Sequence, residues 1–163
     1  MKAARNLLNI LLSLSLASLV HLGGAAVAAP LPAEAVPMSP DELSELYRGK
    51  TQLWREGIGG YFYASDNKLA GYSRKRVETY AVGRWYVTDA GEVWVVERWI
   101  WGPGRQGRGP MKRTCWEHRK FGGQIWKYDN GWYQWNRADG EASRFIKGYK
   151  YYDQVMALHA RLR

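Results

Sequence analysis

The chain has 163 residues, a formal net charge of +9, one cysteine and nine tryptophans. This length suits one domain with its own core, and a single cysteine excludes a disulfide framework within the chain. The positive charge favours anionic partners, although it can also serve solubility alone.

Residues 1–28 have the three parts of a secretory signal peptide. Lys2 and Arg5 form a basic start, residues 7–20 form an uncharged apolar run, and Ala28 ends a segment of small residues that signal peptidase accepts. The apolar run is shorter than the ~20 residues of a spanning helix. We therefore expect cleavage after Ala28, a periplasmic or secreted protein, and no transmembrane span after cleavage.

Two parts are expected after the leader: a Pro/Ala-rich linker over residues 29–38 and a single β domain over residues 39–163. Loss of the leader leaves 22 basic and 15 acidic residues, a net charge of +7. In that compartment an anionic envelope lipid or glycan is the expected partner, and nucleic acid is not. We expect a monomer.

The domain opens with a helix signal. Ser39 is the expected N-cap, Pro40 the first helical residue and Glu42 the other half of a capping box, and Gly49 stops the helix. We expect this short helix to plug one end of the sheet.

From Thr51 onward, short runs rich in Trp, Tyr, Val and Ile alternate with turn signals about every ten residues. The longest run, 92–101, is mostly apolar on both faces, as in a strand that is covered on both sides or lines a barrel. The pattern predicts an antiparallel β-barrel or a strongly curved sheet, with Val82-Gly83 as one of the turns. The expected strands are 51–55, 60–64, 69–73, 75–81, 84–88, 92–101, 112–120, 124–128, 132–136 and 143–147.

The C-terminal segment from Tyr151 to Leu162 again has helical period, with Val155 and Leu158 on its apolar face. We expect a helix that packs on the outside of the sheet or closes the other end of the barrel. An interfacial membrane helix is the alternative.

A Gly-rich basic loop over residues 102–110 follows the longest strand. It is either a flexible hairpin connection or an anion-contacting loop whose arginines adapt to a ligand beside aromatic rings. On the second interpretation the binding residues are Trp99, Trp101, Arg105, Arg108, Lys112 and Arg113.

The nine tryptophans exceed what a core of this size needs, and three interpretations stay open: packing only, a ligand cavity, or an exposed glycan platform. Cys115 is expected to be a reduced, poorly accessible thiol in a strand, with His118 on the opposite face of that strand. Pairing between chains is the alternative.

Signals for catalysis are weak. His118 and His159 lack the spacing of metal ligands, so we expect no metal site, no cofactor and no catalytic residues. Several acids could act as glycosidase carboxylates, but cross-strand ion pairs explain them more simply. The acids are Glu78, Glu92, Glu97, Glu117 and Asp129, and their expected partners are Arg74, Arg76, Arg98 and Arg119.

Five short motifs follow one another along the chain: Glu45-Leu46-Tyr47-x-Gly49, Gly60-Tyr61-Phe62-Tyr63, Gly83-Arg84-Trp85, Asp89-Ala90-Gly91 and Arg113-Thr114-Cys115-Trp116. Over about residues 41–136 the chain resembles domain-of-unknown-function family 995, exported proteins found mainly in alphaproteobacteria. The layout is similar to lipocalin-like barrels as a fold analogy only. The resemblance implies no activity. It implies a second cysteine after Gly91 that pairs with Cys115, and in this chain Trp94 would fill that place.

Together these observations predict a non-enzymatic exported protein that binds an envelope component, either an apolar ligand in the barrel or an anionic glycan or lipid. The alternative is a small cell-wall-directed enzyme or an enzyme inhibitor.

Overall fold

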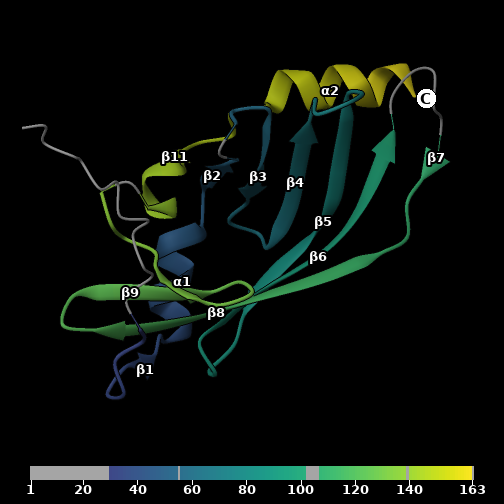
Figure 1. Cartoon of the computed structure of the whole chain (residues 1–163). Helices are drawn as coiled ribbons and strands as arrows, with labels where there is room; N and C mark the ends of the chain where they lie inside the picture. The colour runs from purple at the N-terminus through teal and green to yellow at the C-terminus, as the bar shows by residue number, and fades with distance from the viewer. Residues whose placement is uncertain (1–29, 55, 102–106, 139, 163) are drawn as a thin grey trace, which may run out of the picture.

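The structure is a computed structural model that describes residues 30–54, 56–101, 107–138 and 140–162 (Figure 1). Strands dominate, with one α-helix near each end of this region. In chain order the elements are β1 (Val36–Pro37), α1 (Pro40–Tyr47), β2 (Lys50–Leu53), β3 (Gly59–Tyr63), β4 (Lys68–Ser73), β5 (Thr79–Val87), β6 (Glu92–Trp101), β7 (Gly107–Arg108), β8 (Lys112–Phe121), β9 (Gln124–Tyr128), β10 (Trp132–Gln134), the 3₁₀ helix η1 (Glu141–Arg144), β11 (Phe145–Lys147) and α2 (Tyr152–Arg161).

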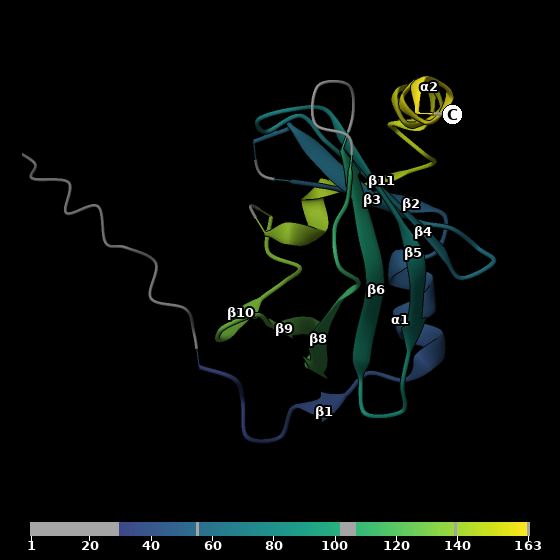
Figure 2. The ribbon, with the colours of Figure 1, turned by 90° about the vertical axis from the view of Figure 1, so that its right-hand side faces the viewer.

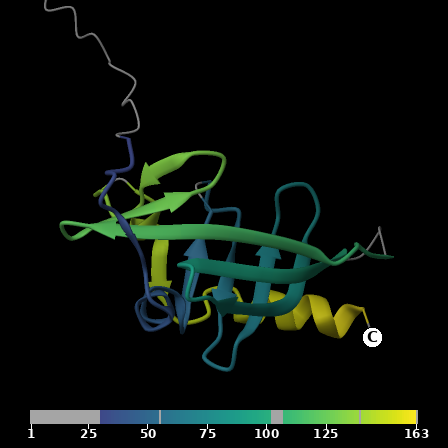
Figure 3. The same ribbon diagram turned by 90° about the horizontal axis from the view of Figure 1, so that it is seen from below.

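The strands form one antiparallel sheet in the order β10-β9-β8-β6-β5-β4-β3-β2-β11, with β1 added to β8 and β7 added to β6. The sheet bends strongly and is not closed, as the views in Figures 2 and 3 show. The expectation of a mainly β fold with a curved sheet and two helices is confirmed.

Helix α1 begins as the sequence predicts. The Ser39 side chain accepts a hydrogen bond from the Glu42 N–H, and the Glu42 carboxylate accepts one from the Ser39 N–H. Gly49 follows the C-cap with a φ of +70°, a conformation that glycine adopts without steric cost. The capping box and the glycine therefore fix both ends of the helix.

The main core lies between α1 and the concave side of the sheet, which we call the inner face. Leu43 and Tyr47 of α1 have no exposed surface and pack against Trp85, Val93 and Trp116. In β6 the residues Val93, Val95, Glu97, Trp99 and Trp101 share the inner face, because side chains alternate along a strand.

Helix α2 packs on the opposite side, which we call the outer face. Val155 and Leu158 are buried against Tyr72 and Tyr80, which lie on β4 and β5. Figure 1 shows α2 lying across one end of these strands, and Figure 2 shows it outside the sheet. Of the two positions expected for this helix, the structure has the outer one. No helix in the described part of the chain is long and apolar enough to cross a membrane.

A buried polar cluster connects strands near the two ends of the open sheet. Glu141 of η1, which is 6% exposed, accepts hydrogen bonds from Gln52 on β2 and Tyr133 on β10. It also forms an ion pair with Lys127 on β9, 2.7 Å from Nζ to Oε1, and Lys127 is only 1% exposed. Burial lowers the Lys127 pKa, although the neighbouring Glu141 carboxylate opposes that shift.

Two sequence predictions about strands were wrong. The turn expected at Val82-Gly83 does not exist, because β5 runs unbroken from Thr79 to Val87. A Cβ at Gly83 would lie 2.1 Å from the Val96 carbonyl oxygen, so this glycine permits close strand approach rather than a turn. The strand expected over 143–147 is instead the end of η1 followed by β11, which has three residues.

The second half of the expected linker packs onto the fold. Val36 and Pro37 pair with Lys120 and Arg119 of β8, and Met38 is 4% exposed within the main core. Residues 1–29, which include the expected signal peptide, lie outside the described residues.

Cys115 is a free, half-buried thiol on the outer face, whereas His118 is fully buried on the inner face. The opposite placement of the two side chains is confirmed, but the thiol is less buried than expected. Burial and the nearby Glu92 and Glu117 carboxylates raise the Cys115 pKa to about 11. Trp94 lies directly opposite Cys115 in the register of β6 and β8.

Candidate anion-binding groove on the outer face

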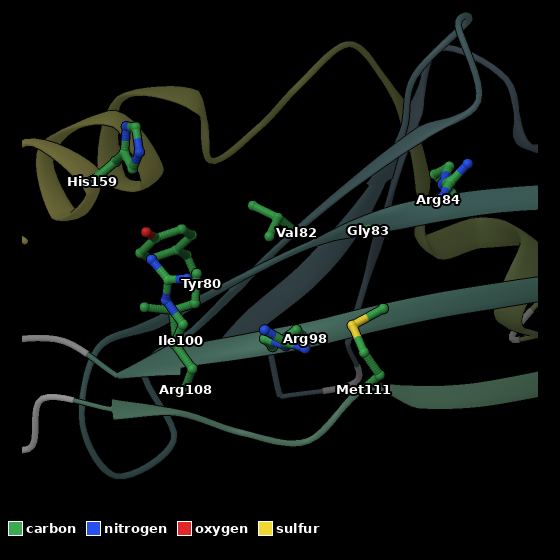
Figure 4. A pocket seen from close by; sticks show the side chains of 9 residues that line it. All are labelled: Tyr80, Val82, Gly83, Arg84, Arg98, Ile100, Arg108, Met111 and His159. Carbon is green, nitrogen blue, oxygen red and sulfur yellow. The ribbon is translucent and has the colours of Figure 1, made fainter.

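A groove of about 540 Å³ lies on the outer face between α2 and the strands beside it (Figure 4). Its side chains come from β5, β6, β7, α2 and the segment before β8. We call it the outer groove, and its lining residues are Tyr80, Val82, Gly83, Arg84, Arg98, Ile100, Arg108, Met111 and His159.

Three arginines surround the outer groove: Arg84, Arg98 and Arg108. Among the described residues that line it there is no Asp or Glu. In Figure 4 Arg84 lies toward one end of the groove and His159 of α2 toward the other, with Arg98 between them. The outer groove therefore combines a concentrated positive charge with a concave shape, which favours an anionic ligand.

The Arg98 guanidinium has an unused donor. Its Nε is buried, and within the described part of the chain it has no hydrogen-bond partner. A buried donor without an acceptor costs about 1–3 kcal/mol, and more for a charged group. An acceptor oxygen from a bound anion would remove that cost.

The rest of the outer groove is apolar and mostly aliphatic. Val82 on β5 is 47% exposed and Met111, directly before β8, is 51% exposed. Ile100 lies on β6, between β5 and β8 in the sheet. Tyr80 is buried and makes an edge contact with the His159 ring, with 6.0 Å between ring centroids. These contacts connect α2 to the floor of the groove.

Of the predicted binding residues, two arginines lie on this outer face. Arg108 lines the outer groove itself. Arg113 lies on β8 beyond it, where its guanidinium donates to the Tyr86 hydroxyl and stacks 5.0 Å from the Trp94 ring. Arg105 lies outside the described residues.

The other predicted residues turn toward the inner face. A separate cavity there is lined by Trp99, Trp101 and Lys112. Lys112 faces the same side as Glu97 because the two residues are direct partners in the β6–β8 register. Trp101, at the end of β6, also borders a small cavity with Arg108 and His159. The sheet thus divides the predicted set between its two faces, although Trp101 and Arg108 meet at the end of β6.

Two arginines of the outer groove were missed by the sequence interpretation. Arg98 was expected to pair with a carboxylate, but its neighbour Glu97 faces the other side of the sheet, and Arg84 received no role. Alternation along β6 places Arg98 with Ile100 on one face, and that signal was present in the sequence. The expected turn at Gly83 hid the same signal for Arg84 in β5.

None of the expected cross-strand ion pairs is formed in the part of the chain that the structure describes. Arg119 pairs with Glu117, 2.7 Å from Nε to Oε1, along β8 rather than across to a neighbouring strand. Within the described region, no group of three or more His, Cys, Asp or Glu side chains is arranged to hold a metal ion.

A family model described as a protein of unknown function (DUF995) matches residues 13–151. The chain belongs to the DUF995 family. The match covers most of the chain and confirms the family resemblance seen in the motifs. Comparison of this DUF995 protein with curated proteins gave no match, and comparison with solved structures gave none either.

Proposed function

We propose that this DUF995 protein is an exported binding protein for an anionic amphiphile, and that the outer groove holds a phosphate-bearing lipid headgroup with part of its acyl chain. The observation that carries the proposal is the buried, unpartnered Nε of Arg98 in a groove that two further arginines line. Guanidinium groups bind phosphate oxygens through paired, charge-assisted hydrogen bonds.

The apolar lining favours a lipid over a glycan. Val82, Ile100 and Met111 are flexible or branched aliphatic side chains, which pack well against an acyl chain. Sugar rings instead prefer flat aromatic surfaces, and the lining has no Trp or Phe, while its Tyr80 is buried.

The expected signal peptide supports the same ligand class. A periplasmic protein with a net charge of +7 meets membranes and lipopolysaccharide that carry phosphate groups. Neither catalysis nor a cofactor is part of this proposal.

Vesicle binding tests the proposal. We expect the purified protein to co-sediment with vesicles of phosphatidylglycerol and phosphatidylcholine, and to bind pure phosphatidylcholine vesicles far more weakly. Replacing Arg84 and Arg108 by Gln should cost about 2 kcal/mol, since each basic side chain near an anionic surface contributes about 1 kcal/mol. The partition coefficient should then fall about thirty-fold.

A matched control separates the outer groove from general charge attraction. Arg48 and Arg76 are exposed elsewhere on the molecule, so Arg48→Gln/Arg76→Gln removes the same charge without touching the groove. The control should retain most of the binding. Equal losses in the two double variants, or no preference for the anionic vesicles, would overturn the proposal.

A further inference from the structure

A second cavity lies on the inner face of the sheet, on the other side of β6 from the outer groove. It has a volume of about 430 Å³, and three aromatic side chains stand close together in it. We call it the inner cavity. The Trp54 ring centroid lies 5.7 Å from that of Tyr61 and 5.8 Å from that of Trp99, and Tyr61 and Trp99 lie 6.0 Å apart.

Glycines on the neighbouring strands leave room for two of these rings to pack against the backbone. A Cβ at Gly59 would lie 2.7 Å from the Trp54 ring, and a Cβ at Gly71 would lie 3.1 Å from the Tyr61 ring. Both rings therefore pack directly on the backbone, as aromatic residues do over strand glycines. All three members of the ring cluster are half-buried, so part of each ring is exposed.

Glu97 lies beside the rings with one carboxylate oxygen unused. The Tyr61 hydroxyl donates to its Oε1 at 2.8 Å, and the Trp99 indole N–H donates to the same oxygen at 3.0 Å. Glu97 is 3% exposed, and its Oε2 has no hydrogen-bond partner among the described residues. Glu97 lines the inner cavity, and a buried carboxylate oxygen without a partner indicates that a hydrogen-bond donor is missing beside it.

We propose that the inner cavity binds a sugar ring, with Glu97 Oε2 accepting a hydrogen bond from a ring hydroxyl and the rings of Trp54, Tyr61 and Trp99 contacting the sugar's C–H face. Flat aromatic surfaces next to a carboxylate match the two sides of a pyranose, one apolar and one rich in hydroxyl donors. Lys75 and Lys112 also line the inner cavity, and their positive charges disfavour a cationic ligand there.

The rings of Trp54 and Tyr61 border two adjoining cavities, which favours an oligosaccharide over a single sugar. A neighbouring cavity of about 540 Å³ shares Trp54 and Tyr61 with the inner cavity and reaches the Glu141 cluster. A chain of two or three sugar rings can therefore contact the same two aromatic residues from both sides. This site lies on the opposite face from the outer groove and does not depend on lipid binding.

Nuclear magnetic resonance of the indole N–H groups tests the proposal directly. Titration with the β1,4-linked trisaccharide of N-acetylglucosamine, with cellotriose and with maltotriose should shift the Trp54 and Trp99 indole signals in a saturable way for at least one sugar. Signals are assigned with Trp54→Phe and Trp99→Phe. If none of the three sugars shifts these signals, the proposal is wrong.

The carboxylate provides the sharper test. Glu97→Gln keeps the side-chain shape and removes the charge, and it should weaken binding of the active sugar ten- to a hundred-fold, the range for one hydrogen bond to a charged group. Glu92→Gln is the matched control, because Glu92 lies on the same strand and also accepts from a tryptophan, Trp94, but outside the inner cavity.

The control should bind the sugar like the wild type. If Glu97→Gln fails to fold, Trp54→Leu is the second variant, which removes one ring and should weaken binding by a similar factor. Unchanged affinity in either folded variant would overturn the site. Vesicle binding should be unchanged in both, so failure here is distinct from failure of the lipid proposal.

Discussion

The ion pair between Glu141 and Lys127 is expected to be the charge contact on which the stability of the fold depends most. Both side chains are buried, at 6% and 1% exposed, and the pair connects η1 to β9 near the open side of the sheet. In the variant Glu141→Gln, Lys127 loses its counter-charge inside the protein. Breaking one partner of a buried pair costs about 3–5 kcal/mol.

Deprotonation of Lys127 limits that cost. A lysine in the unfolded chain has a pKa of about 10.4. Keeping the buried Lys127 amine neutral therefore lowers the free energy of unfolding by about 1.4 kcal/mol for each pH unit below that value. At about pH 8 the limit is therefore about 3 kcal/mol, and at about pH 9.4 it is about 1.4 kcal/mol. Between the lowered pKa of Lys127 in the folded variant and its pKa in the unfolded chain, the unfolded chain holds one more proton, so the stability of Glu141→Gln should rise with pH across that range.

Urea denaturation followed by circular dichroism at several pH values measures both effects. The wild type should show a weaker pH dependence across the same range, because Glu141 opposes the lowering of the Lys127 pKa. The double variant Glu141→Gln/Lys127→Met should recover most of the stability, since it removes the unpaired buried cation.

Asp66→Asn is the matched control, because Asp66 and Lys68 form an ion pair at 2.6 Å that is largely exposed. Its unfolding midpoint should hardly move. A loss below about 1 kcal/mol in Glu141→Gln, with no change in pH dependence, would refute the reasoning that the pair is buried and coupled.

Three further predictions concern titration, thiol reactivity and export. His118 is fully buried, and its Nε2 lies 2.9 Å from the Tyr47 hydroxyl. Burial lowers the His118 pKa to about 3. Its nuclear magnetic resonance signals should therefore stay those of a neutral ring down to about pH 4. Because the unfolded chain then binds the extra proton, stability should fall as pH drops from about 6.5 toward 3, and a His118 that titrates near about 6.5 would contradict this. Cys115, with a pKa raised to about 11, should react with maleimide at about pH 7.5 many times more slowly than a free cysteine in solution, and rapid labelling or a disulfide-linked dimer would contradict this. N-terminal sequencing of exported protein should begin at Ala29, whereas full-length chain in the membrane would contradict the signal peptide.

Local signals predicted the elements well where the cause was local. The capping box at Ser39 and the glycine stop at Gly49 act within one helix, so the sequence alone defines α1. The alternation along β6 likewise predicts a strand with two apolar faces, and the structure has that strand with the same bounds, 92–101.

Long-range contacts were the part that the sequence could not supply. Gly83 looks like a turn residue until the Val96 carbonyl of the neighbouring strand is placed beside it. Glu141 has no local signal that distinguishes it from a surface acid, and its role depends on partners 14 and 89 residues away.

For the candidate sites, too, local signals indicated the region, and long-range contacts decided the arrangement. The sequence directed attention to the region around Trp99, Trp101 and Arg108, but adjacency in sequence concealed that neighbours on a strand face opposite sides. Arg98 and Glu97 are adjacent residues that line different cavities, and each has a buried polar atom without a partner among the described residues. The register of β5, β6 and β8 decides which residues line the outer groove and which line the inner cavity.

The most direct test of the outer groove is the Nε–H resonance of Arg98 during titration with a short-chain phosphatidylglycerol below its micelle concentration. This donor is buried and has no partner in the described structure, so a phosphate oxygen that binds it should move its signal strongly and saturably. The matching phosphatidylcholine should have a much smaller effect. If the Arg98 signal stays in place while exposed arginines such as Arg48 shift, anionic lipid does not bind in the outer groove and the proposed function is wrong.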